Sequence, residues 1–141
     1  VSVNCKFFIS QRRISTGRFA LAMGLNNEAA ELADMARNHI EETGEIYALA
    51  DLHRLQAELA VADGDNETAE KELNTALKVA RKQGAKLWEL RAAIDLSRLL
   101  NQQGRTNEAV SLLGPVYESI NESDCPEDRK LAQEQLADMG Q

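Results

Sequence analysis

The side chains in this sequence that could carry out nucleophilic or metal chemistry are few and far apart. The two histidines, His39 and His53, are 14 residues apart, and neither belongs to an H-E-x-x-H zinc motif. The two cysteines, Cys5 and Cys125, are 120 residues apart, and neither has a second cysteine or a histidine at a metal-ligand spacing. We therefore expect no metal site and two free thiols in a reducing compartment, with a disulfide or redox role as the alternative.

Acidic side chains are the remaining candidates for chemistry, and they gather where helices are expected to begin. They are Glu28, Glu31, Glu67, Glu70, Glu72 and Glu108. Carboxylates in a first helical turn interact favourably with the positive end of the helix dipole, and paired acid–base catalysis is the alternative. The sequence has no G-x-S-x-G motif, no Cys–His pairing and no glycine-rich nucleotide loop. We predict a protein without enzymatic activity and without a cofactor.

Length and charge limit the classes of partner. The 141 residues carry a net charge of −7, which argues against nucleic acid because a phosphate backbone needs a concentrated positive surface. The longest continuous apolar feature, "CKFFIS", is too short for a secretory signal or a membrane span. We expect a soluble, cytoplasmic protein with no membrane partner. The first residue is Val1 rather than methionine, which suggests a fragment of a longer protein or processing.

The elements that would position these side chains are marked by glycines. Three similar stretches, "GLNNEA", "GDNETA" and "GRTNEA", begin 40 residues apart at Gly24, Gly64 and Gly104. Each glycine can end one helix in a left-handed conformation. The next helix would then be capped by a side-chain oxygen, from Asn26, Asn66 or Thr106. Gly44 and Gly84 repeat the same spacing at the ends of the second helices.

The apolar periodicity predicts an all-α fold. The expected helices cover about 10–23, 27–43, 46–63, 66–83, 86–103 and 106–121, with a shorter one at about 127–139. We expect an α–α superhelix, a solenoid of three helical hairpins plus a C-terminal capping helix, rather than a closed bundle. The expected parts are 1–18, an N-terminal segment or partial helix, 19–121, the repeats, and 122–141, a polar break and the capping helix. The apolar side of that helix would hold Leu131, Leu136 and Met139.

Small residues recur in phase with the glycines. The three units read Gly17–Gly24–Ala29–Ala36, Ala57–Gly64–Ala69–Ala76 and Ser97–Gly104–Ala109–Val116. This phasing resembles the tetratricopeptide repeat (TPR), in which small residues lie at the closest helix–helix approaches. The units here are about six residues longer and lack the closing proline, so the resemblance implies a superhelix that is flatter or twisted differently.

Residues 52–117 also carry a narrower resemblance. The segments "HRLQAEL", "ARKQGAKLWELRAA" and "LLGPVY", followed by an acidic break at 122–127, resemble the C-terminal TPR region of large bacterial signalling regulators. In those regulators a nucleotide-cyclase-like or DNA-binding module precedes an ATPase. The resemblance implies a sensor or interaction arm. It does not transfer ATPase or cyclase activity, because the sequence has no G-x-x-x-x-G-K-[ST] phosphate loop.

The first helices of the second and third pairs present the candidate binding surface. Helical spacing places Asp51, Arg54 and Glu58 on one side of 46–63, and Arg91, Ile94, Arg98 and Asn101 on the equivalent side of 86–103. A stripe of alternating charge beside an apolar position suits a peptide that offers carboxylates and a small apolar side chain. Ordinary intrahelical ion pairs on a solvated face are the alternative.

Two aromatic residues have expected packing roles. Trp88, at the start of 86–103, is expected to pack against the preceding helical pair, and an exposed binding anchor is the alternative. Tyr117 is expected to lie beneath the capping helix.

The sequence favours a noncatalytic TPR-like module that binds a protein or peptide, or its own upstream domains, as the C-terminal arm of a bacterial signalling regulator. A receptor for a small inducer is one alternative function. A self-association module, such as a homodimer, is another.

Overall fold

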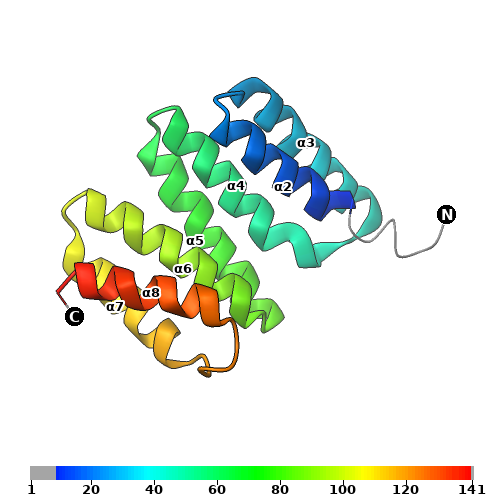
Figure 1. Ribbon diagram of the computed structural model, residues 1–141. Coiled ribbons are helices and arrows are strands. Elements are labelled where there is room, and N and C mark those ends of the chain that lie inside the picture. The colour runs from blue at the N-terminus through cyan, green and yellow to red at the C-terminus, as the bar shows by residue number, and fades with distance from the viewer. Residues whose placement is uncertain (1–8, 141) are drawn as a thin grey trace. The chain divides into compact units, whose positions relative to one another are not determined.

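The computed structural model describes residues 9–140 as helices joined by short turns, and no strand occurs in that range (Figure 1). The elements are α2 (Ile9–Ala22), α3 (Asn26–Thr43), the 3₁₀ turn η1 (Ile46–Ala48), α4 (Leu49–Ala62), α5 (Asn66–Gln83), α6 (Lys86–Gln102), α7 (Thr106–Glu118) and α8 (Pro126–Asp138). The all-α prediction is confirmed, and every expected helix occurs. Part of the 1–18 segment is thus helical from Ile9, while Cys5 lies outside the described residues. The chain divides into two compact units, Val1–Glu72 and Leu73–Gln141.

Four of the interhelical turns share one hydrogen-bond pattern, and this pattern explains the glycine spacing. In each, a glycine has a φ between 65° and 79° and the amide of the next residue donates to a carbonyl five residues back, at 2.8–2.9 Å. The glycines are Gly24, Gly64, Gly84 and Gly104. A Cβ makes this left-handed conformation costly, so glycine is the residue that permits such a tight helical hairpin.

The predicted side-chain caps are wrong by one position. The residue after each glycine both closes the first helix and begins the second, so Asn26, Asn66 and Thr106 are already the first helical residues. Only at α5 does the true capping position hold an acceptor that is used: Asp65 accepts from the Thr68 amide at 3.0 Å and from its hydroxyl at 2.6 Å. The corresponding positions before α3 and α7 make no side-chain cap.

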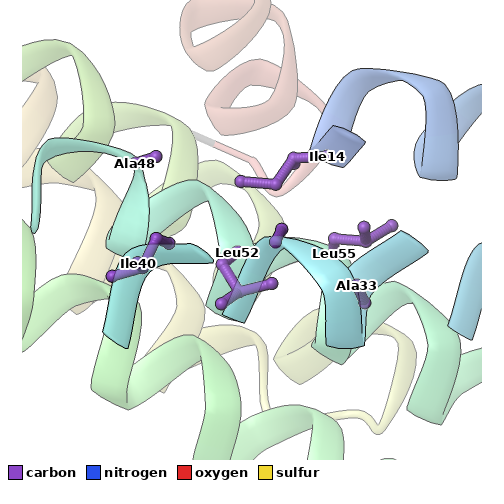
Figure 2. Close-up of a cluster of buried hydrophobic side chains, with 7 residues drawn as sticks. Ile14, Ala33, Ile40, Ala48, Leu52 and Leu55 are labelled. Atoms are coloured by element: carbon purple, nitrogen blue, oxygen red, sulfur yellow. The ribbon is translucent and has the colours of Figure 1, made fainter. Parts of the chain in front are cut away.

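The core of the first unit lies between α2, α3, η1 and α4. Figure 2 shows its aliphatic side chains converging, and they are Ile14, Ala33, Ala36, Ile40, Ala48, Leu52 and Leu55. Each large side chain buried in this way contributes about 1.5–3 kcal/mol relative to an exposed one. Three of these seven residues are alanines, and their small side chains let the neighbouring helices approach closely.

The small residues of the repeat pattern lie at close helix contacts, as the TPR resemblance implied. Ala29, Ala69 and Ala109 have no exposed surface. At Gly17, a Cβ would meet Leu55 Cδ2 at 3.0 Å and Leu32 Cβ at 3.4 Å. Even an alanine at position 17 would require these neighbours to shift by a few tenths of an ångström, and a larger side chain would require more.

In the second unit, α8 packs on α6 and α7, which confirms its role as a capping helix for the last pair. Ala132 and Leu136 are buried, but Leu131 is 42% exposed, so its expected place on the apolar side is wrong. Leu131 and Leu136 are five residues apart, which is about 140° around a helix, and both cannot face α6. Tyr117 lies beneath α8 as predicted, since the Arg129 guanidinium is 4.2 Å from its ring centroid.

Candidate interaction surface

In the first unit, the predicted groove residues of α4 are part of a network that joins α4 to α2. Arg18 of α2 donates to Asp51 at 2.9 Å and to both carboxylate oxygens of Glu58, at 2.9 and 3.1 Å. Arg54 also donates to Asp51, at 3.0 Å, and the Gln11 amide does so at 2.7 Å. Two basic side chains therefore hold two acidic ones between neighbouring helices.

Asp51 is the centre of this network, with only 1% of its surface exposed. Burial alone would raise the pKa of its carboxyl, but Arg18, Arg54 and the Gln11 amide together hold that pKa below its ordinary value of 3.8. Asp51 is thus a buried structural anion and offers no surface to a partner. A buried charge is tolerated only when it is paired and hydrogen-bonded in this way.

The partners of this network follow the repeat. Gln11 and Asp51 are 40 residues apart, and so are Arg18 and Glu58. Each pair therefore joins equivalent positions of consecutive units. Sequence reasoning missed Gln11 and Arg18 because it considered only the first helices of the second and third pairs as a binding surface. The 40-residue spacing, applied backwards from Asp51 and Glu58, would have identified them.

In the second unit, α6 exposes one narrow polar stripe. Beyond the first turn, its apolar residues and Ser97 are buried, including Ile94 at 2% exposure, so Ile94 belongs to the interior rather than to an open groove. The residues left at least partly exposed after the first turn are Arg91, Asp95, Arg98, Asn101 and Gln102. Arg98 is the most open of the charged ones, at 49%, and lies 4.0 Å from Asp95.

Arg91 is held in place at the start of the stripe. It donates to both carboxylate oxygens of Asp128 in α8, at 3.0 and 3.2 Å, and its guanidinium lies 5.0 Å from the Trp88 ring centroid. Trp88 is half-buried under this cation, and its packing against the preceding pair stays a prediction. Of the predicted site residues, Arg91, Arg98 and Asn101 therefore share one accessible side of α6.

The Gln135 side chain fixes α8 beside the stripe. Its amide donates to the Ile94 carbonyl at 3.0 Å and also bonds the Ser97 hydroxyl. Ser97 in turn donates to the Ile94 carbonyl at 3.0 Å. The polar groups of Gln135, Ser97 and Ile94 find their hydrogen-bond partners only when α8 is in this position, so these bonds set the position of α8 along α6.

The histidines make ordinary side-chain contacts. His53 Nδ1 lies 2.6 Å from Glu72, and His39 Nε2 lies 3.4 Å from Glu45. No group of three histidine, cysteine, aspartate or glutamate side chains within residues 9–140 is placed to hold a metal ion. The described carboxylates at the starts of α3, α5 and α7 include Glu28, Glu67 and Glu108, in the positions expected from the dipole argument.

No helix among residues 9–140 is both long enough and apolar enough to cross a membrane. Cys125 of this part of the chain is a free, half-buried thiol. The alternative function of a small-inducer receptor stays a prediction.

Comparison with known proteins supports the repeat assignment. The family model of the tetratricopeptide repeat matches residues 48–118, which is half of the chain. Comparison with curated proteins and with solved structures gives no match. TPR repeats generally mediate protein–protein interaction and are generally noncatalytic. The match covers α4 to α7 with the turns at Gly64, Gly84 and Gly104, and on this basis the chain belongs to the tetratricopeptide repeat family.

Proposed function

We propose that this chain is a noncatalytic module that binds a protein or peptide through the polar stripe of α6. The observation that carries the proposal is that α6 is buried except for its first turn and for this one side, where Arg91, Arg98 and Asn101 are accessible. A stripe with two guanidinium groups and an amide suits carboxylates on an extended or helical peptide. Asp95, beside Arg98, would repel a peptide carboxylate that is not aligned with one of the two guanidinium groups.

The geometry favours α6 over α4 as the binding helix. On α4, the side chains of Arg54 and Asp51 are only 12% and 1% exposed, whereas Arg98 on α6 is 49% exposed. On α6, Arg91 is fixed by Asp128 and Trp88, which gives it one defined orientation at low entropic cost on binding. Arg98 would then supply the more adaptable contact.

The experiment is a peptide selection followed by affinity measurements. Peptides enriched from a random display library on the whole chain would be synthesised, and their Kd measured by fluorescence anisotropy for the wild type and Arg98→Glu. We expect enrichment of acidic peptides and a loss of about tenfold or more in affinity for Arg98→Glu. Lys78→Glu, a similar charge reversal on α5, is the control and should bind as the wild type does.

Two results would contradict the assignment. Equal affinity of Arg98→Glu and the wild type, with unchanged helicity, would remove α6 as the binding surface. Absence of any enriched peptide would remove the peptide-binding role itself.

We further propose that the module is the C-terminal arm of a larger cytoplasmic bacterial signalling regulator. The support is the resemblance of "HRLQAEL", "ARKQGAKLWELRAA" and "LLGPVY" to such regulators. In that setting the natural ligand of α6 would be an upstream domain of the same protein. The reading frame around this segment tests the idea, since an ATPase module upstream is expected and a free-standing repeat protein would contradict it.

A further inference from the structure

One side of the first unit carries a basic groove between α2 and α3. The groove has a volume of about 280 Å³, and its described lining consists of Ile9, Arg12, Arg13, Thr16 and Leu32. Two apolar side chains thus lie beside two guanidinium groups, and this lining includes no carboxylate. Arg13 also donates to the Met35 carbonyl at 3.1 Å, which holds it near α3.

The outer side of α8 has the opposite character. Glu127, Leu131, Glu134 and Asp138 are exposed and follow one another at intervals of four, three and four residues, which places them on one side of the helix. Lys130 is the one basic residue beside them. This side is turned away from Ala132 and Leu136, which are buried on α6 and α7. Leu131, at 42% exposure, is therefore an apolar residue surrounded mainly by carboxylates.

We propose that the groove between α2 and α3 receives α8 of a second copy of this chain. Leu131 would pack on Ile9 and Leu32, while Glu134 and Asp138 would meet Arg12 and Arg13. The lengths agree: the distance along the helix from Ile9 to Thr16, and from Leu131 to Asp138, is seven residue rises in each case, or about 10 Å. Such a contact is head-to-tail, because it joins different surfaces of the two copies. Each assembly therefore keeps one free groove at one end and one free α8 at the other, and further copies can add unless the rotation between copies closes a ring.

Sedimentation of the whole chain tests this proposal. At low salt, the average mass should rise with protein concentration from the micromolar to the millimolar range. At about 1 M salt, where the Debye length is about 3 Å, the association should weaken strongly. A chain that remains monomeric over the whole range at low salt would overturn the proposal.

Charge reversal on each side tests the surfaces themselves. Arg12→Glu with Arg13→Glu, or Glu134→Lys with Asp138→Lys, should raise the dissociation constant about tenfold or more. Neither pair should disturb its helix, because acids near the start of α2 and bases near the end of α8 are favoured by the helix dipole. An equimolar mixture of the two double variants should associate again, since each then offers the other a complementary pair of surfaces.

Matched controls change the same charge elsewhere. Glu41→Lys with Glu42→Lys, at the exposed end of α3, should associate as the wild type does. Association that is insensitive to both reversals, or double variants that fail to rescue each other while their circular dichroism is native, would overturn the assignment. Association that appears only after residues 1–8 are deleted would mean that the chain's own N-terminal segment fills the groove, and would overturn it as well.

Discussion

Replacing Arg18 should destabilise the first unit far more than replacing an ordinary surface cation. In Arg18→Met, the aliphatic stem of the side chain is kept, but Asp51 loses a bond of 2.9 Å and Glu58 loses bonds of 2.9 and 3.1 Å. A hydrogen bond between charged groups contributes about 1.5–3 kcal/mol, and the more exposed pair with Glu58 about 0.2–1 kcal/mol. Because Arg54 and Gln11 still hold Asp51, we expect a loss of about 2–4 kcal/mol.

Urea denaturation followed by circular dichroism measures this loss. With an m value of about 2 kcal/mol/M, the first unit should unfold at a midpoint lower by about 1–2 M. Repeat proteins can unfold in more than one step, so hydrogen exchange of α2 and α4 should accompany the titration. Lys78→Met also removes one exposed cation, from α5, and should change stability by less than about 0.5 kcal/mol.

A double-mutant cycle identifies the cause. Asp51→Asn removes the buried charge. Its loss of unfolding free energy should therefore be smaller in the Arg18→Met protein than in the wild type, by at least about 1.5 kcal/mol. Two results would refute the reasoning: equal effects of Arg18→Met and Lys78→Met, or effects of the two substitutions that add within about 0.5 kcal/mol.

Three further predictions concern acid stability and the glycines. The pKa of Asp51 lies below 3.8 in the folded protein, so the stability that its ionised carboxylate contributes is present above about pH 5 and is lost as pH falls through the folded-state pKa. Asp51→Asn should therefore lose less stability than the wild type between about pH 5 and pH 2. Equal losses of the two proteins in acid titrations would contradict this. Gly17→Val should lower the free energy of unfolding by about 1–3 kcal/mol, because an added Cβ alone already meets Leu55 Cδ2 at 3.0 Å and Leu32 Cβ at 3.4 Å, and urea denaturation without such a loss would contradict the close contact. Gly64→Ala should cost about 1–2 kcal/mol because its φ is 78°, and thermal melts that show no loss would refute the role given to this turn.

Helix positions were predictable because the sequence carries local signals for them. The glycines at 24, 64, 84 and 104 end helices through their positive φ, which requires no knowledge of distant residues. The small residues at 29, 69 and 109 follow at a fixed offset, so their burial could also be expected. The capping side chains were wrong by one residue, because the turn is tighter than two separate helix ends would be.

The candidate surface was less predictable, because exposure is decided by neighbouring helices. Asp51 and Ile94 lie on the expected sides of their helices by spacing, yet both are buried. Leu131 was expected inside and is exposed, because Gln135 and Leu136 fix the rotation of α8 on α6. Hydrophobic character alone does not give the rotation of a short helix with a weak apolar pattern.

By itself, the sequence determined the class of fold, the helical pairs and their 40-residue period, since these depend on residues within a turn or two of each other. The tertiary structure decided which charged side chains form ion pairs between helices and which remain accessible to solvent. Arg18 and Asp51 are 33 residues apart, and Arg91 and Asp128 are 37 apart. Only the packing of separate helices brings such side chains within 3 Å, and that packing leaves Arg98 accessible while it buries Asp51.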